Sequence, residues 1–219
     1  MSEKRVLVTG PSSGIGRACV EALARGGAYV AAAARDVGML DTLANLIDNR
    51  IDIALHIGHL PDSSLISTPV DTVCRVLCGS PTYLAGAGRP KKPADLEDHV
   101  CVNFEALASG ATWSFASTRG QRPDIQTGVR RLSVNTAEAA IDAAIAGVGV
   151  THVLSYQAAH AVEEGSLTRV LRDFEPEPMP VTLVHVGQKM QPLKIRRIIE
   201  FCVPRLRRVG QDSVQINTV

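Results

Sequence analysis

The chain has 219 residues, 45% of them hydrophobic, and 23 Lys and Arg balance 22 Asp and Glu to leave a formal net charge of +1. This length and composition predict a globular chain with a substantial buried core and exclude a mainly disordered one. A charge so close to zero gives no overall positive field to hold DNA or an anionic membrane. No apolar run approaches the roughly 20 residues of a membrane-spanning helix, and the N-terminus lacks a signal-peptide pattern. We therefore expect a cytoplasmic protein.

The cysteines and histidines indicate neither a disulfide framework nor a metal site. The five cysteines are scattered and form no Cys-x-x-Cys pair, which favours free thiols in a reducing compartment. His56 and His59 are three residues apart, but no third ligand lies near them in the sequence. We therefore expect no bound metal.

The first third of the chain alternates apolar runs with amphipathic segments. Residues 5–9, 29–34 and 51–57 have the composition of strands, and helical spacing of apolar residues predicts helices over 15–25 and 40–48. Strands separated by short helices are typical of parallel βαβ units, so the fold class is α/β.

The remainder is less regular. We predict strands over 72–77, 113–115, 129–134 and 181–186, with a loop over 80–98 that contains one possible helical turn. Helices are predicted over 136–146, 156–164 and 192–206; Asn135 is expected to cap the first of these, and Gly147-Val148-Gly149 to end it.

Two segments, Ser67–Asp71 and Phe174–Pro180, are expected to carry the chain between two lobes. Residues 1–70 and 179–208 would then form lobe I, residues 72–174 would form lobe II, and the polar residues 209–219 would be a frayed tail.

A glycine-rich turn, Thr9-Gly10-Pro11-Ser12-Ser13-Gly14-Ile15-Gly16, stands where the first strand becomes a helix. Glycines there let the backbone approach a phosphate, and the helix N-terminus offers unpaired N–H groups. Residues 5–36 resemble the opening of the short-chain dehydrogenase/reductase family. That resemblance implies NADP binding by Gly10, Gly14, Ile15 and Gly16, with Arg35 on the 2′-phosphate.

The reductase pattern is incomplete further along the chain. That family's catalysis needs a Tyr-x-x-x-Lys pair, but Tyr156 is followed four residues later by His160, and position 143, where the catalytic serine is expected, is Ala. Without the tyrosine–lysine pair, acid catalysis on a carbonyl has no mechanism here.

A second resemblance covers more of the chain. From about residue 43 to 206 the sequence resembles the effector-binding domain of LysR-type transcriptional regulators. The residues that carry it, in order, are Ile51–Leu65, Arg75–Leu84, Gly88–Arg89–Pro90, Pro93–Leu96, Asn135–Ala139, Gly147–Val150, Gly165–Leu171 and Lys194–Ile195–Arg196. The resemblance implies a two-lobed, periplasmic-binding-protein-like (type II) fold with Rossmann-like lobes, a small effector between the lobes, and a homodimer. The DNA-reading winged helix of that family has no counterpart in this sequence, so we expect no DNA contact by this chain alone.

Eight polar residues are candidates for holding such a ligand: Thr9, Ser12, Ser13, Arg35, His59, Asn135, Thr136 and Thr151. They follow predicted strands or begin predicted helices, where α/β proteins bind ligands. Six of them also have a structural interpretation. Ser12, Ser13, Asn135 and Thr136 can be helix caps, Arg35 a solvated loop side chain, and Thr151 part of a turn that leads into a strand.

The leading hypothesis is a non-catalytic domain that senses a small anionic or aromatic metabolite and needs no cofactor. The alternative is an NADP-binding oxidoreductase of the short-chain type, and a nucleotide sensor that reads the dinucleotide without reducing it is a third possibility.

Overall fold

The chain divides into two compact units, which a computed structural model describes over residues 5–9, 29–33, 53–60, 65–104, 112–116, 124–126, 129–186 and 193–214. Unit 1 comprises Met1–Val73 and Met179–Gln215, and unit 2 comprises Cys74–Pro178 with Ile216–Val219. The chain therefore passes between the units at residues 73/74 and again at 178/179.

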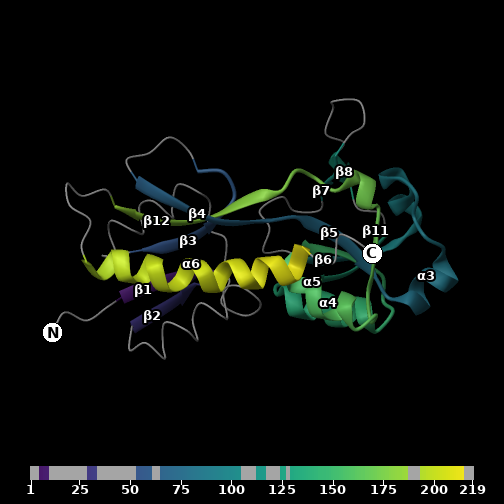
Figure 1. Ribbon diagram of the computed structural model, residues 1–219. Coiled ribbons are helices and arrows are strands. Elements are labelled where there is room, and N and C mark those ends of the chain that lie inside the picture. The colour runs from purple at the N-terminus through teal and green to yellow at the C-terminus, as the bar shows by residue number, and fades with distance from the viewer. Residues whose placement is uncertain are drawn as a thin grey trace. The chain divides into compact units, whose positions relative to one another are not determined.

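Unit 1 is built on a five-stranded sheet in the order β2-β1-β3-β12-β4 (Figure 1). Its strands are β1 (Arg5–Thr9), β2 (Tyr29–Ala33), β3 (Ala54–Ile57), β4 (Leu65–Val73) and β12 (Met179–Val186). Strand β1 runs parallel to β2 and β3, whereas β12 runs antiparallel to β3 and β4. The strands predicted over 5–9, 29–34, 51–57 and 181–186 are confirmed, and the helices predicted over 15–25 and 40–48 lie outside the described residues.

The segment expected to be the first crossing is instead the middle of β4. This strand pairs with β12 from Leu65 to Val73, so the prediction that Ser67–Asp71 leaves the lobe is wrong. Pro69 faces Thr182 next to a register irregularity in this pairing. Because β4 is an edge strand, the missing N–H of a proline is tolerated there. The strand predicted over 72–77 is in fact two strands, which meet at Cys74.

Helix α6 (Leu193–Val214) packs against β4. It buries a stripe of apolar side chains, namely Ile195, Ile198, Cys202 and Leu206. The helix continues past the predicted end at 206, so residues 209–214 are helical rather than a frayed tail. Pro204 lies inside it, and Arg205 Nη1 donates to the carbonyl of Phe201 at 2.8 Å, which supplies a donor beside the proline.

Unit 2 contains a second five-stranded sheet, in the order β11-β5-β10-β6-β9. Its strands are β5 (Arg75–Gly79), β6 (Val100–Phe104), β9 (Val129–Val134), β10 (Val150–Leu154) and β11 (Thr168–Val170). Strand β6 is parallel to β9 and β10, and β5 is antiparallel to β10 and β11. Strands β7 (Thr112–Ser114) and β8 (Asp124–Gln126) form a separate antiparallel pair.

Both faces of this sheet are covered by apolar side chains. On one face, helices α4 (Ala137–Ile145) and α5 (Ser155–Glu163) pack their alanines against Val76, Val102 and Val153. The other face packs against α3 (Pro81–Ala87) and the 3-10 turn η1 (Pro93–Asp98) through Leu84 and Leu96. A second 3-10 turn, η2 (Arg172–Phe174), follows β11. Trp113 and Phe115 belong to the second cluster and are 7% and 2% exposed, so they are core residues.

Two glycines fix the path from α4 into β10. Gly147 has φ +79°, a conformation that L residues rarely adopt, and it ends α4 as predicted. Gly149 lies so close to β6 that an added Cβ would sit 2.2 Å from the carbonyl oxygen of Val100. Of the helices that the structure describes, none is long and apolar enough to cross a membrane.

Candidate ligand-binding site

The sheet of unit 1 brings the ends of three parallel strands to one edge. Thr9, the last residue of β1, is level with Ala33 at the end of β2, and Val8 is level with Leu55 of β3. The segments that follow all three strands therefore leave the sheet at the same edge, where α/β sheets bind ligands. Thr9 and His59 lie at this edge. The other predicted residues of this unit, Ser12, Ser13 and Arg35 together with Gly10, Gly14, Ile15 and Gly16, lie outside the described residues.

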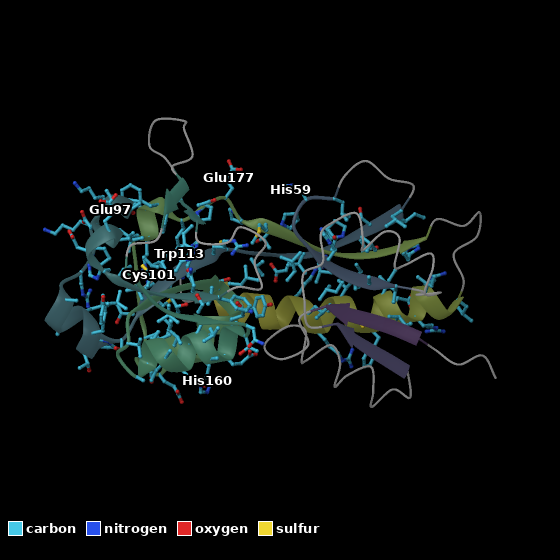
Figure 2. The ribbon with its side chains drawn as sticks, turned by 180° about the vertical axis from the view of Figure 1, so that it is seen from behind. His59, Glu97, Cys101, Trp113, His160 and Glu177 are labelled. Atoms are coloured by element: carbon cyan, nitrogen blue, oxygen red, sulfur yellow. The ribbon has the colours of Figure 1, made fainter. Side chains whose placement is uncertain are left out.

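His59 follows a turn that is held to the neighbouring strand. Gly58 has φ +118°, and its N–H donates to the carbonyl of Pro180 at 2.8 Å. This contact fixes the path of the chain just after β3, and the His59 side chain beyond it is exposed (Figure 2). On β3 itself, His56 faces Thr182 of β12, whose buried hydroxyl oxygen has no hydrogen-bond partner among the described residues. Within those residues, no group of three or more His, Cys, Asp or Glu is placed to hold a metal ion.

Unit 2 has a corresponding edge, where β6, β9 and β10 run parallel and end at Phe104, Val134 and Leu154. Asn135 and Thr136 are exposed just past the end of β9. Thr136 is the N-cap of α4, since its hydroxyl accepts the N–H of Ala139 at 3.2 Å. The prediction that Asn135 caps this helix is wrong by one residue, because either residue type is a good cap and the sequence does not distinguish them. The Asn135 side chain makes no described cap contact and is exposed beside the helix N-terminus.

Thr151 lies inside the sheet rather than at its edge. Its side chain is fully buried in β10, and its hydroxyl donates to the carbonyl of Val102 on β6 at 3.1 Å. This bond occupies the only hydrogen that the hydroxyl can donate. Thr151 therefore has a structural partner in the described fold, while Asn135 and Thr136 remain the exposed predicted residues of unit 2.

Three further polar residues of unit 2 were not among the predicted ligand-binding residues. Glu138, in the first turn of α4, has a buried carboxylate oxygen without a hydrogen-bond partner among the described residues. Burial, and secondarily the charge of Glu138, raise the pKa of Tyr156 in the first turn of α5 to about 12. Asn103 on β6 is 3% exposed, and its side-chain oxygen likewise lacks a described partner. A polar residue in the otherwise apolar run Val-Cys-Val-Asn-Phe was the available signal for Asn103.

Comparisons with known proteins agree on one family. The family model described as "LysR substrate binding domain" matches residues 36–207. A putative transcriptional regulator of Pseudomonas aeruginosa is 32% identical over 138 residues, which are 60% of this chain and 44% of that protein. The HTH-type transcriptional regulator CrgA of Neisseria meningitidis is 28% identical over 164 residues, 74% of this chain and 54% of that protein. The chain thus spans about half the length of the curated relatives it matches.

Solved structures share the fold. The regulatory domain of CrgA from Neisseria meningitidis superposes with a TM-score of 0.72 at 22% identity, and the match covers 94% of this chain and 100% of that one. The regulatory domain of AphB from Vibrio vulnificus gives a TM-score of 0.72 at 18% identity, over 92% of this chain and 98% of that one. These regulatory domains have the two-lobed, periplasmic-binding-protein-like fold that the second resemblance implied.

The reductase resemblance of residues 5–36 receives no support. None of the proteins reported above is a reductase, and the matches to regulatory domains cover more than nine tenths of the chain, with only a small part left for a foreign segment. The described strands form two five-stranded mixed sheets and one two-stranded sheet rather than one long parallel sheet. A glycine-rich run after a strand is not specific to reductases, because glycine-rich loops before helices bind anions in more than one class of protein.

Proposed function

The chain belongs to the LysR substrate-binding domain family and is the effector-binding domain of a LysR-type regulator, and on this premise we propose that it binds a small anionic or aromatic metabolite through the carboxyl edges of its two sheets. Unit 1 contributes Thr9, Ser12, Ser13, Arg35 and His59, and unit 2 contributes Asn135 and Thr136. The ligand is bound and released without chemical change, and no cofactor takes part.

The observation that carries this proposal is the start of α4. The edge formed by β6, β9 and β10 presents the N-terminus of a nine-residue helix, flanked by two exposed polar side chains, Asn135 and Thr136. Unpaired N–H groups and the positive end of the helix dipole favour a negatively charged partner there. In unit 1, the positive charge of Arg35 is the matching feature of the sequence. Both features favour an anion, such as a carboxylate, over a cation.

The response to the ligand is proposed to be a change in the relative position of the two units. A ligand that contacts polar groups of both units binds best to the arrangement in which it can reach both sets of groups. Binding therefore increases the population of that arrangement. We propose that a cytoplasmic homodimer of the full-length protein passes this change on to transcription.

A thermal-shift screen tests the proposal. The purified chain is titrated with a panel of aromatic and aliphatic carboxylates, with the matching amides and with NADPH, while its melting temperature is followed. A ligand at about one hundred times its dissociation constant stabilises the folded state by about 3 kcal/mol, a shift of several degrees for a domain of this size. We expect a carboxylate to give this shift and its amide to give a much smaller one.

Matched variants locate the site. Two variants, Arg35→Ala and the double variant Ser12→Ala with Ser13→Ala, are expected to lower the affinity for the carboxylate found in the screen at least tenfold. Ser166→Ala is the control and should bind normally, because Ser166 precedes β11 at the end of the unit 2 sheet opposite to Asn135 and Thr136. A shift produced by NADPH alone, or carboxylate binding unaffected by these variants, would contradict the proposed function.

A further inference from the structure

The two segments in which the chain passes between the units are fixed to unit 2 in different ways. The first crossing is the single residue Cys74, between the end of β4 at Val73 and the start of β5 at Arg75. The second crossing is Glu175–Pro178, between η2 and β12. Each crossing has a set of contacts within unit 2 and a set within unit 1, so the residues between these sets can be identified.

The first crossing is held by Ser155 through two reciprocal hydrogen bonds. The N–H of Ser155 donates to the carbonyl of Cys74 at 2.8 Å, and the N–H of Cys74 donates to the hydroxyl oxygen of Ser155 at 3.3 Å. Leu154 faces Arg75 in the antiparallel β5–β10 ladder, so Ser155 and Cys74 are the next pair. Ser155 already begins α5, where its carbonyl is committed to the helix. Its hydroxyl replaces the carbonyl as the acceptor and extends the ladder by one residue.

The second crossing is held by a buried ion pair. Arg169 of β11 contacts both carboxylate oxygens of Glu175, with Nη2 at 2.8 Å and 2.6 Å from them. The two side chains are only 5% and 16% exposed, so the pair is shielded from solvent. The carbonyl of Phe174, one residue earlier, accepts the N–H of Ala116 at 2.8 Å. Glu175 is therefore held through its side chain by Arg169, and the residue before it is held through its carbonyl.

The two sets of contacts lie close to each other in unit 2. Arg169 faces Cys78 of β5, the strand that begins immediately after the first crossing. The pKa of the Cys74 thiol is raised, mainly by burial and further by the charge of Glu175. The charge of Arg169 acts in the opposite direction and lowers this pKa. One region of unit 2 thus anchors both crossings.

On the side of unit 1 the crossings are joined to each other. Val73 pairs with Met179 in the β4–β12 ladder, and Thr72 pairs with Pro180. No residue separates Val73, fixed in unit 1, from Cys74, fixed in unit 2. Three residues, Pro176-Glu177-Pro178, separate Glu175 from Met179, and two of them are prolines with restricted φ.

We propose that Ser155 and the Arg169–Glu175 pair are positioning residues that fix both crossings on unit 2, so that the units turn about the Val73–Cys74 peptide. This concerns how the proposed effector response is transmitted, and to that extent it extends the proposed function. The arrangement confines the motion to a few backbone dihedrals. Loss of either anchor adds freely rotating residues to the hinge and widens the range of positions that the units sample.

The test measures the distance between the units without any ligand, so its outcome does not depend on whether an effector binds. Spin labels are attached through genetically encoded ketone residues at Ser67 of unit 1 and Asp142 of unit 2, both exposed. This labelling avoids the native cysteines. Double electron–electron resonance then gives the distribution of distances between the two labels, in the wild-type chain and in the variants Ser155→Ala and Glu175→Gln. NMR hydrogen exchange reports the Cys74 amide in the same proteins.

We expect both variants to broaden the distance distribution by at least about half, and Ser155→Ala to speed exchange of the Cys74 amide severalfold. Ser155→Thr, which keeps the hydroxyl, should restore the wild-type distribution. The controls Ser166→Ala and Glu163→Gln remove a hydroxyl and an exposed charge elsewhere in unit 2 and should change neither readout. If Glu175→Gln does not fold, Glu175→Asp, which keeps the charge on a shorter side chain, takes its place.

A wild-type distance distribution in folded Ser155→Ala and Glu175→Gln would overturn the proposal. So would exchange that rises uniformly over unit 2 rather than at the crossings, since this would show that the contacts stabilise the unit as a whole and do not position the hinge.

Discussion

The imidazole ring of His152 stacks on the ring of Phe115, with centroids 5.2 Å apart and planes 23° apart. Trp113 lies on the same histidine at 5.4 Å, tilted by 46°. His152 is 4% exposed, and burial together with the charge of Arg75 lowers its pKa to about 3. The ring is therefore neutral at physiological pH and acts as an aromatic core residue of unit 2.

The buried histidine predicts acid sensitivity. An unfolded chain protonates His152 near its ordinary value of 6.5, whereas the folded chain does so only near 3. Between these values the unfolded state binds more protons, so stability falls as pH falls, by at most about 1.4 kcal/mol per pH unit from this group. Urea unfolding at several pH values between 7 and 4 measures the slope. His152→Phe, which keeps an aromatic ring, should make the slope shallower, and an unchanged slope would contradict the assignment.

Gly149→Ala is expected to destabilise the protein by about 2 to 4 kcal/mol, because the added Cβ would lie 2.2 Å from the backbone oxygen of Val100. Gly86→Ala, in helix α3, is the matched control, since nothing lies within 4 Å of the added atom. That substitution should be neutral or stabilise by up to about 1 kcal/mol. Chemical denaturation distinguishes the two. Equal effects would mean that β10 does not approach β6 as described.

Thr136→Ala should cost about 1 kcal/mol, because the hydroxyl caps the N–H of Ala139. Asn135→Ala should cost much less, because Asn135 is not the cap. Thermal unfolding of both variants provides the stability comparison. If Asn135→Ala proved the more destabilising, the helix would begin one residue earlier than the structure shows.

The native cysteines are expected to react slowly with thiol reagents. Burial raises the pKa of Cys78 to about 12, and Cys74 is shifted in the same direction, also chiefly by burial. Cys101 and Cys202 are buried as well. Because the thiolate is the reactive form, iodoacetamide at pH 7.5 should modify these four at rates far below that of a free thiol until the chain is unfolded. Peptide mapping by mass spectrometry gives the rates, and rapid labelling of Cys78 in the folded protein would contradict its burial.

The sequence predicted the class of fold well because its strands are local apolar runs. Composition and flanking glycines were enough to predict the strands over residues 5–9, 29–34 and 181–186. Strands β6, β8 and β11 and most of β4 were not predicted. For two of these the reason is physical: Pro69 interrupts the pattern of β4 although an edge strand tolerates it, and the run Val100–Phe104 carries Asn103 in its interior. Antiparallel pairing of β12, which comes more than one hundred residues after β3, is decided by tertiary contacts and not by local pattern.

The candidate site was predicted only in part. The sequence placed Asn135 and Thr136 correctly at the start of a helix, but the choice of cap depends on backbone geometry that either residue satisfies. Thr151 was picked out as a hydroxyl after a glycine turn, and only the pairing of β10 with β6 shows that it donates to Val102. Ser155 was not singled out, because its role depends on Cys74, which lies 81 residues earlier in the chain.

The central claim is that the chain binds a carboxylate and leaves it chemically unchanged. Isothermal titration calorimetry with the carboxylate that gives the largest thermal shift tests this most directly, when the ligand is recovered afterwards and its mass is measured by mass spectrometry. The account predicts saturable binding of one ligand per chain, at least tenfold weaker in Arg35→Ala, with the recovered ligand unchanged in mass. A chain that binds no carboxylate but consumes NADPH in the presence of a carbonyl compound would contradict it.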